Sequence, residues 1–295
     1  MSDFAGGNHP ELPQPFSSTI DVDIFGMSDQ GHIRENNEDH YLVVRGVRVL
    51  ETVFGNLTGN RPGQRFEETG YGFIVADGLG GEAAGEVASR EAIFGLLNLA
   101  LLTPDWQFKW ELKEMNTVKW RMQDRFRRVN ANLVQRATAN ADLNGMGTTM
   151  TAALSHGKNL VIGHIGDSRA YLLHQGKLKR LTRDHTLAEH LLGEGNDPIN
   201  YRLDTLKNAL MQALGRSESE CAPDVDEYLL EDGDQLMLCT DGLTDMLEDA
   251  QIESVLLNEE SAQSACRSLV KLALDKGGVD NVTVIVARYS IPHVE

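Results

Sequence analysis

The sequence predicts an α+β fold in which two β-sheets pack on one another and helices cover them. Short segments rich in β-branched and aromatic residues, bounded by Gly, Asp or Asn, have the composition of strands. Fewer and longer segments repeat apolar residues at steps of three and four, which is the spacing of one helix face. The strands cluster between the helices instead of alternating strictly with them, and this favours packed sheets over a parallel sheet of βαβ units.

The predicted strands follow one another through most of the chain. They occupy residues 20–28, 40–44, 71–76, 149–154, 159–165, 169–173, 177–181, 225–230, 234–240 and 282–289. Several are close together between residues 149 and 181. The intervening stretches SHGKN (155–159) and HQGK (174–177) have turn composition, so we expect an antiparallel meander here.

Three segments predict helices. Residues 82–102 are apolar nearly all round, which is typical of a deeply buried helix. Residues 112–137 carry charged residues on one helix face and an apolar stripe on the other. The stripe is made of Met115, Val118, Met122, Phe126, Val129 and Leu133. A similar stripe near the end of the chain consists of Ala262, Ala265, Cys266, Leu269, Leu272 and Ala273.

Three further stretches lack a regular apolar pattern. Residues 1–19 are rich in Pro, Gly and Ser and predict a loose tail. Residues 46–70, which contain GNLTGNRPGQRFEETG, predict a long polar loop. Residues 184–223 hold two short helical patterns, TLAEHLL (186–192) and DTLKNALMQAL (204–214), and predict a lid-like insertion.

Composition narrows the class of partner and compartment. The 295 residues carry a net charge of −17, which repels nucleic acid and anionic lipid and excludes both as favoured partners. The three cysteines are odd in number and form no C-x-x-C, so a reducing compartment is favoured. The start lacks the pattern of a signal peptide, and no apolar run approaches the ~18 residues of a membrane span. We expect a cytoplasmic protein that contacts no membrane.

Acidic residues stand at the ends of five predicted strands. An Asp-Gly pair after a single strand is most often only a turn, but acids at so many strand ends favour one shared site. Crowded carboxylates repel one another unless cations neutralise them or some take up protons. Mg²⁺ and Mn²⁺ prefer such oxygen ligands. The acids are Glu38, Asp39, Asp77, Asp167, Asp241 and Asp280.

Seven motifs carry a family resemblance. In chain order they are SDQGHIRENNED (28–39), VADGLGG (75–81), GMGTTMTAAL (145–154), IGDSRAYL (165–172), LTRDHT (181–186), LCTDGLTD (238–245) and GGVDNVTVIVAR (277–288). Together they resemble the metal-dependent serine/threonine protein phosphatases of the 2C type, and most of all the bacterial single-domain members. The resemblance implies a β-sandwich of two antiparallel sheets flanked by helices, in four layers α-β-β-α. It also implies a catalytic domain over 20–290, with 46–70 as a variable loop, 184–223 as a flap and 291–295 as a tail.

The resemblance also implies a metal site. Asp77 would bridge two metal ions. Glu38 and the carbonyl of Gly78 would hold one of them, and Asp241 and Asp280 would hold the other. The implied cofactors are Mn²⁺ or Mg²⁺, as two tightly bound ions and a weaker third.

Four more residues are given roles by the same motifs. Asp167 would help to hold the third ion, sharing Asp241, and Arg34 would grip the substrate phosphate through its guanidinium fork. Asp39 and Asn281 would lie beside the metal ligands and hydrogen-bond to the cluster.

The implied reaction is hydrolysis of phosphoserine and phosphothreonine on proteins by a hydroxide that bridges the two metals, without a covalent phosphoenzyme. The implied partners are phosphorylated proteins, modified by a cognate serine/threonine kinase, and the expected state is a monomer. Leu79 stands where the animal enzymes have a histidine proposed to protonate the leaving oxygen. A metal-bound water near Asp167 is the preferred acid in its place, and His185 is the second candidate.

Two alternative functions remain at the level of sequence. The chain could be an inactive family member that binds phosphoproteins, although none of the implied ligand acids is lost. It could also hydrolyse small phosphoesters. The run DVDIF (21–25) superficially resembles the Asp-x-Asp start of haloacid-dehalogenase-type phosphatases, but Phe25 occupies a position where that family needs Thr or Val.

Overall fold

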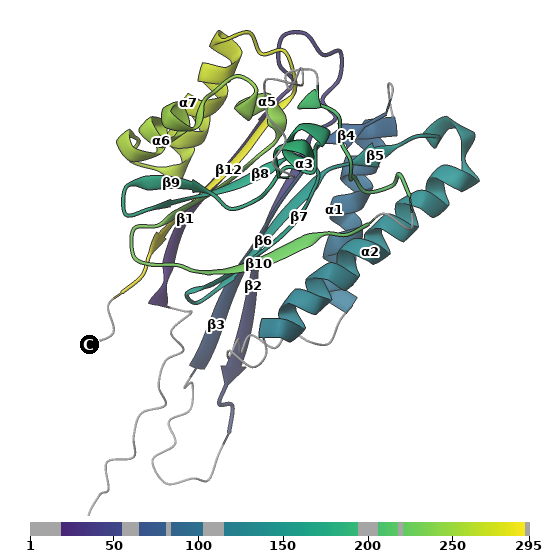
Figure 1. Cartoon of the computed structure of the whole chain (residues 1–295). Coiled ribbons are helices and arrows are strands. Elements are labelled where there is room, and N and C mark those ends of the chain that lie inside the picture. Colours follow the sequence, from purple (N-terminus) through teal and green to yellow (C-terminus); the bar gives the residue numbers. More distant parts are fainter. Residues whose placement is uncertain are drawn as a thin grey trace, which may run out of the picture.

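The structure, a computed structural model, describes residues 19–54, 65–80, 84–102, 115–193, 206–217 and 221–292. Two five-stranded antiparallel sheets face one another, and helices lie on the outer side of each (Figure 1). The predicted α+β class, a sandwich in four layers, is confirmed. The predicted domain from 20 to 290 stays a prediction, and the predicted tails lie mostly outside the described residues.

The first sheet joins the two ends of the described chain. Its strand order is β1-β12-β11-β8-β9, with bounds β1 (Asp21–Asp29), β12 (Val282–Ser290), β11 (Gln235–Cys239), β8 (Arg169–His174) and β9 (Lys177–Arg180). Helices α6 (Asp249–Asn258) and α7 (Ala262–Asp275) cover its outer face. The predicted apolar stripe of α7 is buried against β1 and β12, as expected for a helix that docks by one face.

The second sheet carries the two long helices. Its order is β10-β7-β6-β3-β2, with bounds β10 (Asp224–Leu229), β7 (Asn159–Ile165), β6 (Met150–His156), β3 (Arg65–Ala76) and β2 (His40–Glu51). Helices α1 (Ala84–Leu102) and α2 (Met115–Ala139) cover this sheet. Both helices were predicted from the sequence. Gly163 of β7 makes room for α2, because a Cβ there would lie 2.7 Å from Met122 and 3.0 Å from Phe126.

The space between the sheets is filled by apolar side chains from both. Phe73 and Val75 of one sheet meet Leu238, Ile285 and Ala287 of the other, all of them fully buried or nearly so. Such a dry, close-packed interface gives the strand ends fixed positions. Side chains at those ends are therefore held on a rigid frame.

Short elements surround one end of the sandwich. They are β4 (Gly78–Leu79), paired with β5 (Gly147–Thr148), the 3₁₀ helix η2 (Ala141–Leu143), α3 (Leu187–Gly193) and α5 (Asp241–Thr244). The sequence analysis did not identify β4, β5, α5 or α6. β4, β5 and α5 have two to four residues and carry too little periodicity to be recognised, and the pairing of the two strands depends on distant parts of the chain. The ten-residue α6, which buries Ile252 and Leu256, was long enough to be recognised and was overlooked.

The meander predicted from 149 to 181 is wrong at its centre. Both predicted turns form, and they close the hairpins β6–β7 and β8–β9. However, β7 and β8 belong to different sheets, and β8 pairs with β11. The chain crosses between the sheets at residues 166–168, where Gly166 adopts a φ of +107° that other residues rarely take. Strands β7 and β8 are buried along most of their length on both faces, so the sequence pattern could not show which sheet each one joins.

The loop predicted at 46–70 is also wrong in part. Strands β2 and β3 continue as a two-stranded ribbon as far as the pair Glu51↔Arg65, and Arg48 and Glu68 form an ion pair at 3.1 Å on it. Val47, Arg48 and Val49 alternate in the first arm, which is a strand pattern that the polar composition of the whole segment obscured. Residues 55–64 lie outside the described residues.

One of the two helical patterns predicted between residues 184 and 223 is confirmed, and the assignment of this segment as a flap stays a prediction. The first helical pattern forms α3. The second does not continue as a helix beyond residue 206, where the description resumes. Instead, Leu210 bridges to Thr186 and Leu214 bridges to Thr148. Backbone pairing with neighbouring segments therefore overrides the helical spacing. In the described part of the chain, none of the helices is long and apolar enough to span a membrane.

The contact of α2 with the second sheet predicts that Phe126→Ala strongly lowers the stability of the folded protein. Phe126 is fully buried over β7, so its truncation should lower the free energy of unfolding by about 3–5 kcal/mol. Denaturant unfolding followed by circular dichroism measures the loss. Phe94→Ala in α1 is the matched control, because Phe94 is 52% exposed and should cost much less. Equal losses in the two variants would contradict the packing described.

Candidate active site

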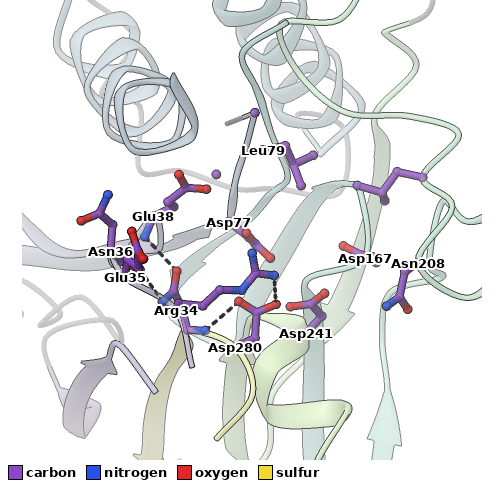
Figure 2. A pocket seen from close by; sticks show the side chains of 14 residues that line it. Arg34, Glu35, Asn36, Glu38, Asp77, Leu79, Asp167, Asn208, Asp241 and Asp280 are labelled. Atoms are coloured by element: carbon purple, nitrogen blue, oxygen red, sulfur yellow. Dashed lines mark hydrogen bonds and ion pairs between the residues drawn. The ribbon is translucent and has the colours of Figure 1, made fainter. Parts of the chain in front are cut away.

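A cavity of about 520 Å³ opens at the end of the sandwich where the short elements gather. Figure 2 shows acidic side chains and one arginine pointing into it. The sequence-predicted residues that line it are Arg34, Glu38, Asp77, Gly78, Asp167, Asp241, Asp280 and Asn281. Asp39 lies buried beside them. Their roles as ligands stay predictions, but the structure brings all nine together.

The acids come from the ends of strands in both sheets. Asp77 lies between β3 and β4, and Asp167 lies in the crossing from β7 to β8. Asp241 begins α5 directly after β11, and Asp280 directly precedes Asn281 and β12. Because β11 and β12 pair with Cys239 opposite Val284, the last two carboxylates are delivered side by side.

The backbone of Asp77 is fixed by two threonines. Its carbonyl oxygen accepts from the Thr148 hydroxyl at 2.7 Å and from the Thr149 N–H at 2.9 Å. Its own N–H donates to the Thr149 hydroxyl at 3.1 Å. The carboxylate therefore projects from a rigid point at the centre of the cavity wall.

Glu38 is placed by glycines that the sequence analysis missed. A Cβ on Gly85 of α1 would lie 2.5 Å from the Glu38 carboxylate, and a Cβ on Gly78 would lie 2.3 Å from the Gly85 carbonyl oxygen. The Ser89 hydroxyl donates to the Glu38 carbonyl at 2.6 Å. Only glycine permits so close an approach of the helix to the acid. The run GLGGEAAGE (78–86), with four glycines in nine residues, was a signal for such an approach.

Asn281 organises the loop that carries Arg34 and Glu38. Its side-chain amide donates to the carbonyl oxygens of Gln30 and Asn36, each at 2.8 Å. Its side-chain oxygen accepts from the Glu38 N–H at 2.9 Å. One buried amide thus holds the backbone of the loop at three residues. This agrees with the prediction that Asn281 supports the metal ligands through hydrogen bonds.

Asp39 has one carboxylate oxygen fully engaged and one without a partner. Oδ2 accepts from the hydroxyls of Thr240 and Thr283, both at 2.7 Å. Among the described residues, Oδ1 is buried and finds no hydrogen-bond partner. Burial raises the pKa of Asp39 to about 7. A buried carboxylate oxygen left in this way fits a neighbouring cation or its hydration water.

The electrostatics of the cavity favour cations or protons. Burial, with repulsion from neighbouring acids, raises the pKa of Asp77 well above its ordinary value, that of Asp241 to about 6 and that of Asp167 to about 8. The carboxyls of Asp77 and Asp241 lie within hydrogen-bonding reach of each other. Oxygen ligands alone fit hard divalent ions.

The acids surround a space instead of meeting at a point. Among the residues that the structure describes, no three His, Cys, Asp or Glu side chains stand in the arrangement that would grip a metal ion directly. A water in liquid takes about 30 Å³, so the cavity has room for ions that keep much of their hydration. The residues present therefore fit hydrated divalent cations.

Arg34 lies at the mouth of the cavity with its side chain 54% exposed. Its guanidinium pairs with Asp280 at 2.5 Å, a contact that the sequence analysis did not foresee. Its other N–H donors remain available to an anion. The arginine therefore stands between solvent and the acids, where an incoming phosphate would meet it.

The flap supplies a wall that sequence reasoning also missed. Asn208 and Leu210 line the cavity, as does Leu79, and Asn208 lies on the side away from Arg34 (Figure 2). His185 does not face the cavity with a free nitrogen. Its Nδ1 accepts from the Gly166 N–H at 3.2 Å, and its Nε2 lies 3.1 Å from Asp224. This geometry disfavours His185 as the acid.

Comparison with known proteins agrees with the site. Residues 64–273 match the family model described as protein phosphatase 2C. The chain belongs to the protein phosphatase 2C family. It is 33% identical over 270 residues to the serine/threonine phosphatase stp of Listeria welshimeri, which covers 90% of this chain and 94% of that protein. It is 37% identical over 261 residues to the serine/threonine protein phosphatase PstP of Mycobacterium tuberculosis, covering 88% of this chain and 43% of that protein.

Solved structures of 2C phosphatases share the fold. The crystal structure of the catalytic domain of PstP in complex with two manganese ions superposes with a TM-score of 0.70 at 33% identity, covering 92% of this chain and all of that one. Stp1 from Staphylococcus aureus gives a TM-score of 0.70 at 28% identity, covering 96% and 99%. The family and enzyme class that the motifs predicted, a metal-dependent serine/threonine protein phosphatase, are confirmed.

The raised pKa values of the buried acids predict how pH controls ion binding. Between about pH 4, the ordinary carboxyl value, and the raised values near 6 to 8, the folded protein binds more protons than the unfolded chain. The free energy of unfolding without ions should therefore fall as pH rises through this window. Bound Mg²⁺ replaces those protons, so its stabilising effect should grow with pH.

The measurement is the rise in melting temperature caused by saturating MgCl₂ at pH 6 and at pH 8. We expect the larger rise at pH 8. NaCl at matched ionic strength controls for screening. A rise that is equal at both values, or smaller at pH 8, would show that these carboxylates do not bind the ion.

Proposed function

We propose that this 2C phosphatase hydrolyses phosphoserine and phosphothreonine on proteins at the cavity between Arg34 and the six acids. The observation that carries the proposal is the convergence of an oxygen-only ligand set and one exposed guanidinium on a single cavity. Family membership supplies the reaction class. The placement of individual roles rests on the geometry given above.

The chain's own oxygens would hold two divalent ions. Asp77, fixed at the centre of the wall, would contact both. Glu38 and the carbonyl of Gly78 would hold one ion, and Asp241 and Asp280 would hold the other. Ions bound there supply a water acidified to near-neutral pKa as nucleophile and neutralise phosphoryl charge. Mn²⁺ or Mg²⁺ suits these ligands, and Asp167 with Asp241 would hold a weaker third ion.

Arg34 would bind the phosphate of the substrate. Its guanidinium is anchored on one side by Asp280, which limits its motion while it keeps donors for two phosphate oxygens. The anchoring acid is itself a proposed ligand. Arg34 therefore aligns the phosphate with the same oxygens that hold the ions, and stabilises its negative charge during transfer.

Asp167 would help to protonate the leaving oxygen of the substrate. Leu79 occupies the cavity wall but has no proton to give. Asp167 lines the same cavity, so its carboxylate can orient a water that carries the proton for the leaving oxygen. His185 is occupied by Gly166 and Asp224, which leaves Asp167 as the better-placed residue.

The wider setting follows the same reasoning. Free thiols at Cys221, Cys239 and Cys266 support the cytoplasm as compartment. The substrates would be phosphoproteins made by a cognate serine/threonine kinase, and the enzyme would act as a monomer. The ribbon of β2 and β3 and the flap are the variable surfaces best placed to select among them.

The deciding experiment is hydrolysis of a phosphothreonine peptide with and without Mn²⁺. We expect phosphate release that needs the ion and stops with excess chelator. Asp241→Asn should lower turnover about 100-fold or more, since it removes a ligand charge. Asp275→Asn, an exposed acid at the end of α7, is the control and should behave like the unaltered enzyme.

Two outcomes would reject the proposal in favour of the alternatives. Tight binding of the phosphopeptide with no release of phosphate at any ion concentration would identify a phosphoprotein-binding module. Hydrolysis confined to small phosphoesters, with none on phosphopeptides, would identify a hydrolase of a different substrate class. Full activity after ion removal would reject the metal mechanism itself.

Substitution of Asp167 tests whether this residue helps to protonate the leaving group. Asp167→Ala should lose most activity on the phosphothreonine peptide and less on p-nitrophenyl phosphate, whose leaving group is a weak base and scarcely needs an acid. Calorimetric titration should show the two tighter ions retained. Equal losses on both substrates would exclude the acid role, and loss of a tight ion would place Asp167 among the ligands of the pair.

A further inference from the structure

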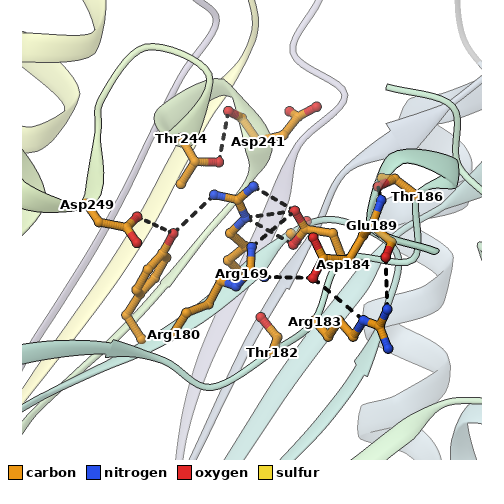
Figure 3. A network of polar contacts seen from close by, with 12 residues as sticks. Arg169, Arg180, Thr182, Arg183, Asp184, Thr186, Glu189, Asp241, Thr244 and Asp249 are labelled. Carbon is orange, nitrogen blue, oxygen red and sulfur yellow. Dashed lines mark hydrogen bonds and ion pairs between the residues drawn. The ribbon is translucent and has the colours of Figure 1, made fainter. Parts of the chain in front are cut away.

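The residues on either side of Asp167 are gripped by two consecutive residues at the start of the flap. On one side, Gly166 is held by His185. On the other side, Arg169 is held by Asp184 through contacts of its Nε and Nη2 at 2.6–3.1 Å (Figure 3). Asp167 thus lies in a short span whose two ends are fastened to the segment that leads into the flap.

His185 meets Gly166 at both of its backbone polar groups. The Gly166 N–H donates to Nδ1 of the imidazole at 3.2 Å, and the Gly166 carbonyl accepts from the His185 N–H at 2.7 Å. Gly166 also holds a φ of +107°, with no room for a Cβ beside Thr149. Glycine takes this conformation without strain, so the turn that aims Asp167 depends on Gly166 itself and on the two hydrogen bonds that His185 makes to it.

The same contacts define one tautomer of His185. Since Nδ1 accepts a hydrogen bond from a backbone N–H, the ring proton must lie on Nε2, where it donates to Asp224 of β10 at 3.1 Å. The ring also packs on His164, with centroids 4.9 Å apart. The ring is thus oriented by β10 on one side and by the sheet beneath it on the other.

His185 connects this turn to the flap wall of the cavity. Its carbonyl accepts from the Met211 N–H at 2.8 Å, and the next residue, Thr186, bridges to Leu210. Leu210 lines the cavity. Displacement of His185 would therefore move the flap wall and Asp167 together.

We infer that His185, oriented by Asp224, is a positioning residue that holds Asp167 and the flap wall in register for leaving-group protonation. The inference rests on the proposed function, since it assigns His185 to the step that Asp167 serves. It replaces the role of acid that the sequence suggested for His185. The histidine acts through Gly166, and it does not touch the substrate.

Two substitutions separate the contacts of the ring. The oxygen of His185→Asn can occupy the position of Nδ1 and accept from Gly166, whereas the amide of His185→Gln occupies the position of Nε2 and can reach only Asp224. We expect His185→Ala and His185→Gln to lose about 10- to 100-fold in turnover on the phosphothreonine peptide. The loss on p-nitrophenyl phosphate should be smaller, and His185→Asn should restore most of the peptide activity.

A second measurement does not depend on turnover. Hydrogen exchange of the peptide spanning residues 164–170 should speed up in His185→Ala and His185→Gln and stay slow in His185→Asn, with or without ions. His174→Ala is the matched control. His174, the last residue of β8, lies 2.8 Å from Asp234, so the substitution removes another histidine–aspartate pair. It should change neither turnover nor the hydrogen exchange of residues 164–170.

The outcomes distinguish this inference from the proposed function. If the unaltered protein shows no ion-dependent hydrolysis, the proposed function fails, and the inference falls with it even where the exchange pattern appears. If hydrolysis is present but exchange at 164–170 is unchanged in His185→Ala, the positioning role is overturned. It is equally overturned if His185→Asn is as impaired as His185→Gln, or if both substrates lose activity to the same degree.

Discussion

The burial of several carboxylates around one cavity is the constraint on which the rest of this structure depends. Like charges held at close quarters away from water destabilise a fold unless cations or protons compensate them. The chain opposes this repulsion with rigid supports: the threonines around Asp77, the amide of Asn281 and the glycines that press α1 against Glu38. Each support lies on the backbone or next to it, so the acids cannot relax apart.

Both sheets contribute acids to this arrangement. Asp241 follows β11 and Asp280 precedes β12, which are neighbouring strands of the first sheet, whereas Asp77 and Asp167 follow strands of the second. The cavity therefore spans the interface between the sheets, and the apolar packing beneath it sets the spacing of the acids. The crossing at Gly166 matters for the same reason, because it carries the chain from one sheet to the other at the point where Asp167 is needed.

Much of this could be predicted from local patterns. Acids at strand ends were recognisable because each acid lies next to a segment with strand composition in the sequence. The seven motifs, in their order along the chain, identified the family. Contacts that depend on distant segments could not be predicted in this way. The β7–β8 crossing, the ribbon within 46–70, the bridges of Leu210 and Leu214, and the grip of His185 on Gly166 all arise from pairing partners that no local period specifies.

The pairing of the first strand with the last has a consequence for a truncated chain. Asp39 hydrogen-bonds to Thr283 across 244 residues, the Glu38 N–H binds Asn281 across 243, and β1 lies along β12 through its whole length. Without β12 and the residues that precede it, the loop that holds Arg34 and Glu38 keeps the contacts of Glu38 with Gly78 and Ser89 but loses those with Asp280 and Asn281. Contacts of such long range form late in folding. A chain truncated before Asp280 would therefore lack several of the contacts that place this loop at the cavity, and we expect it to be inactive.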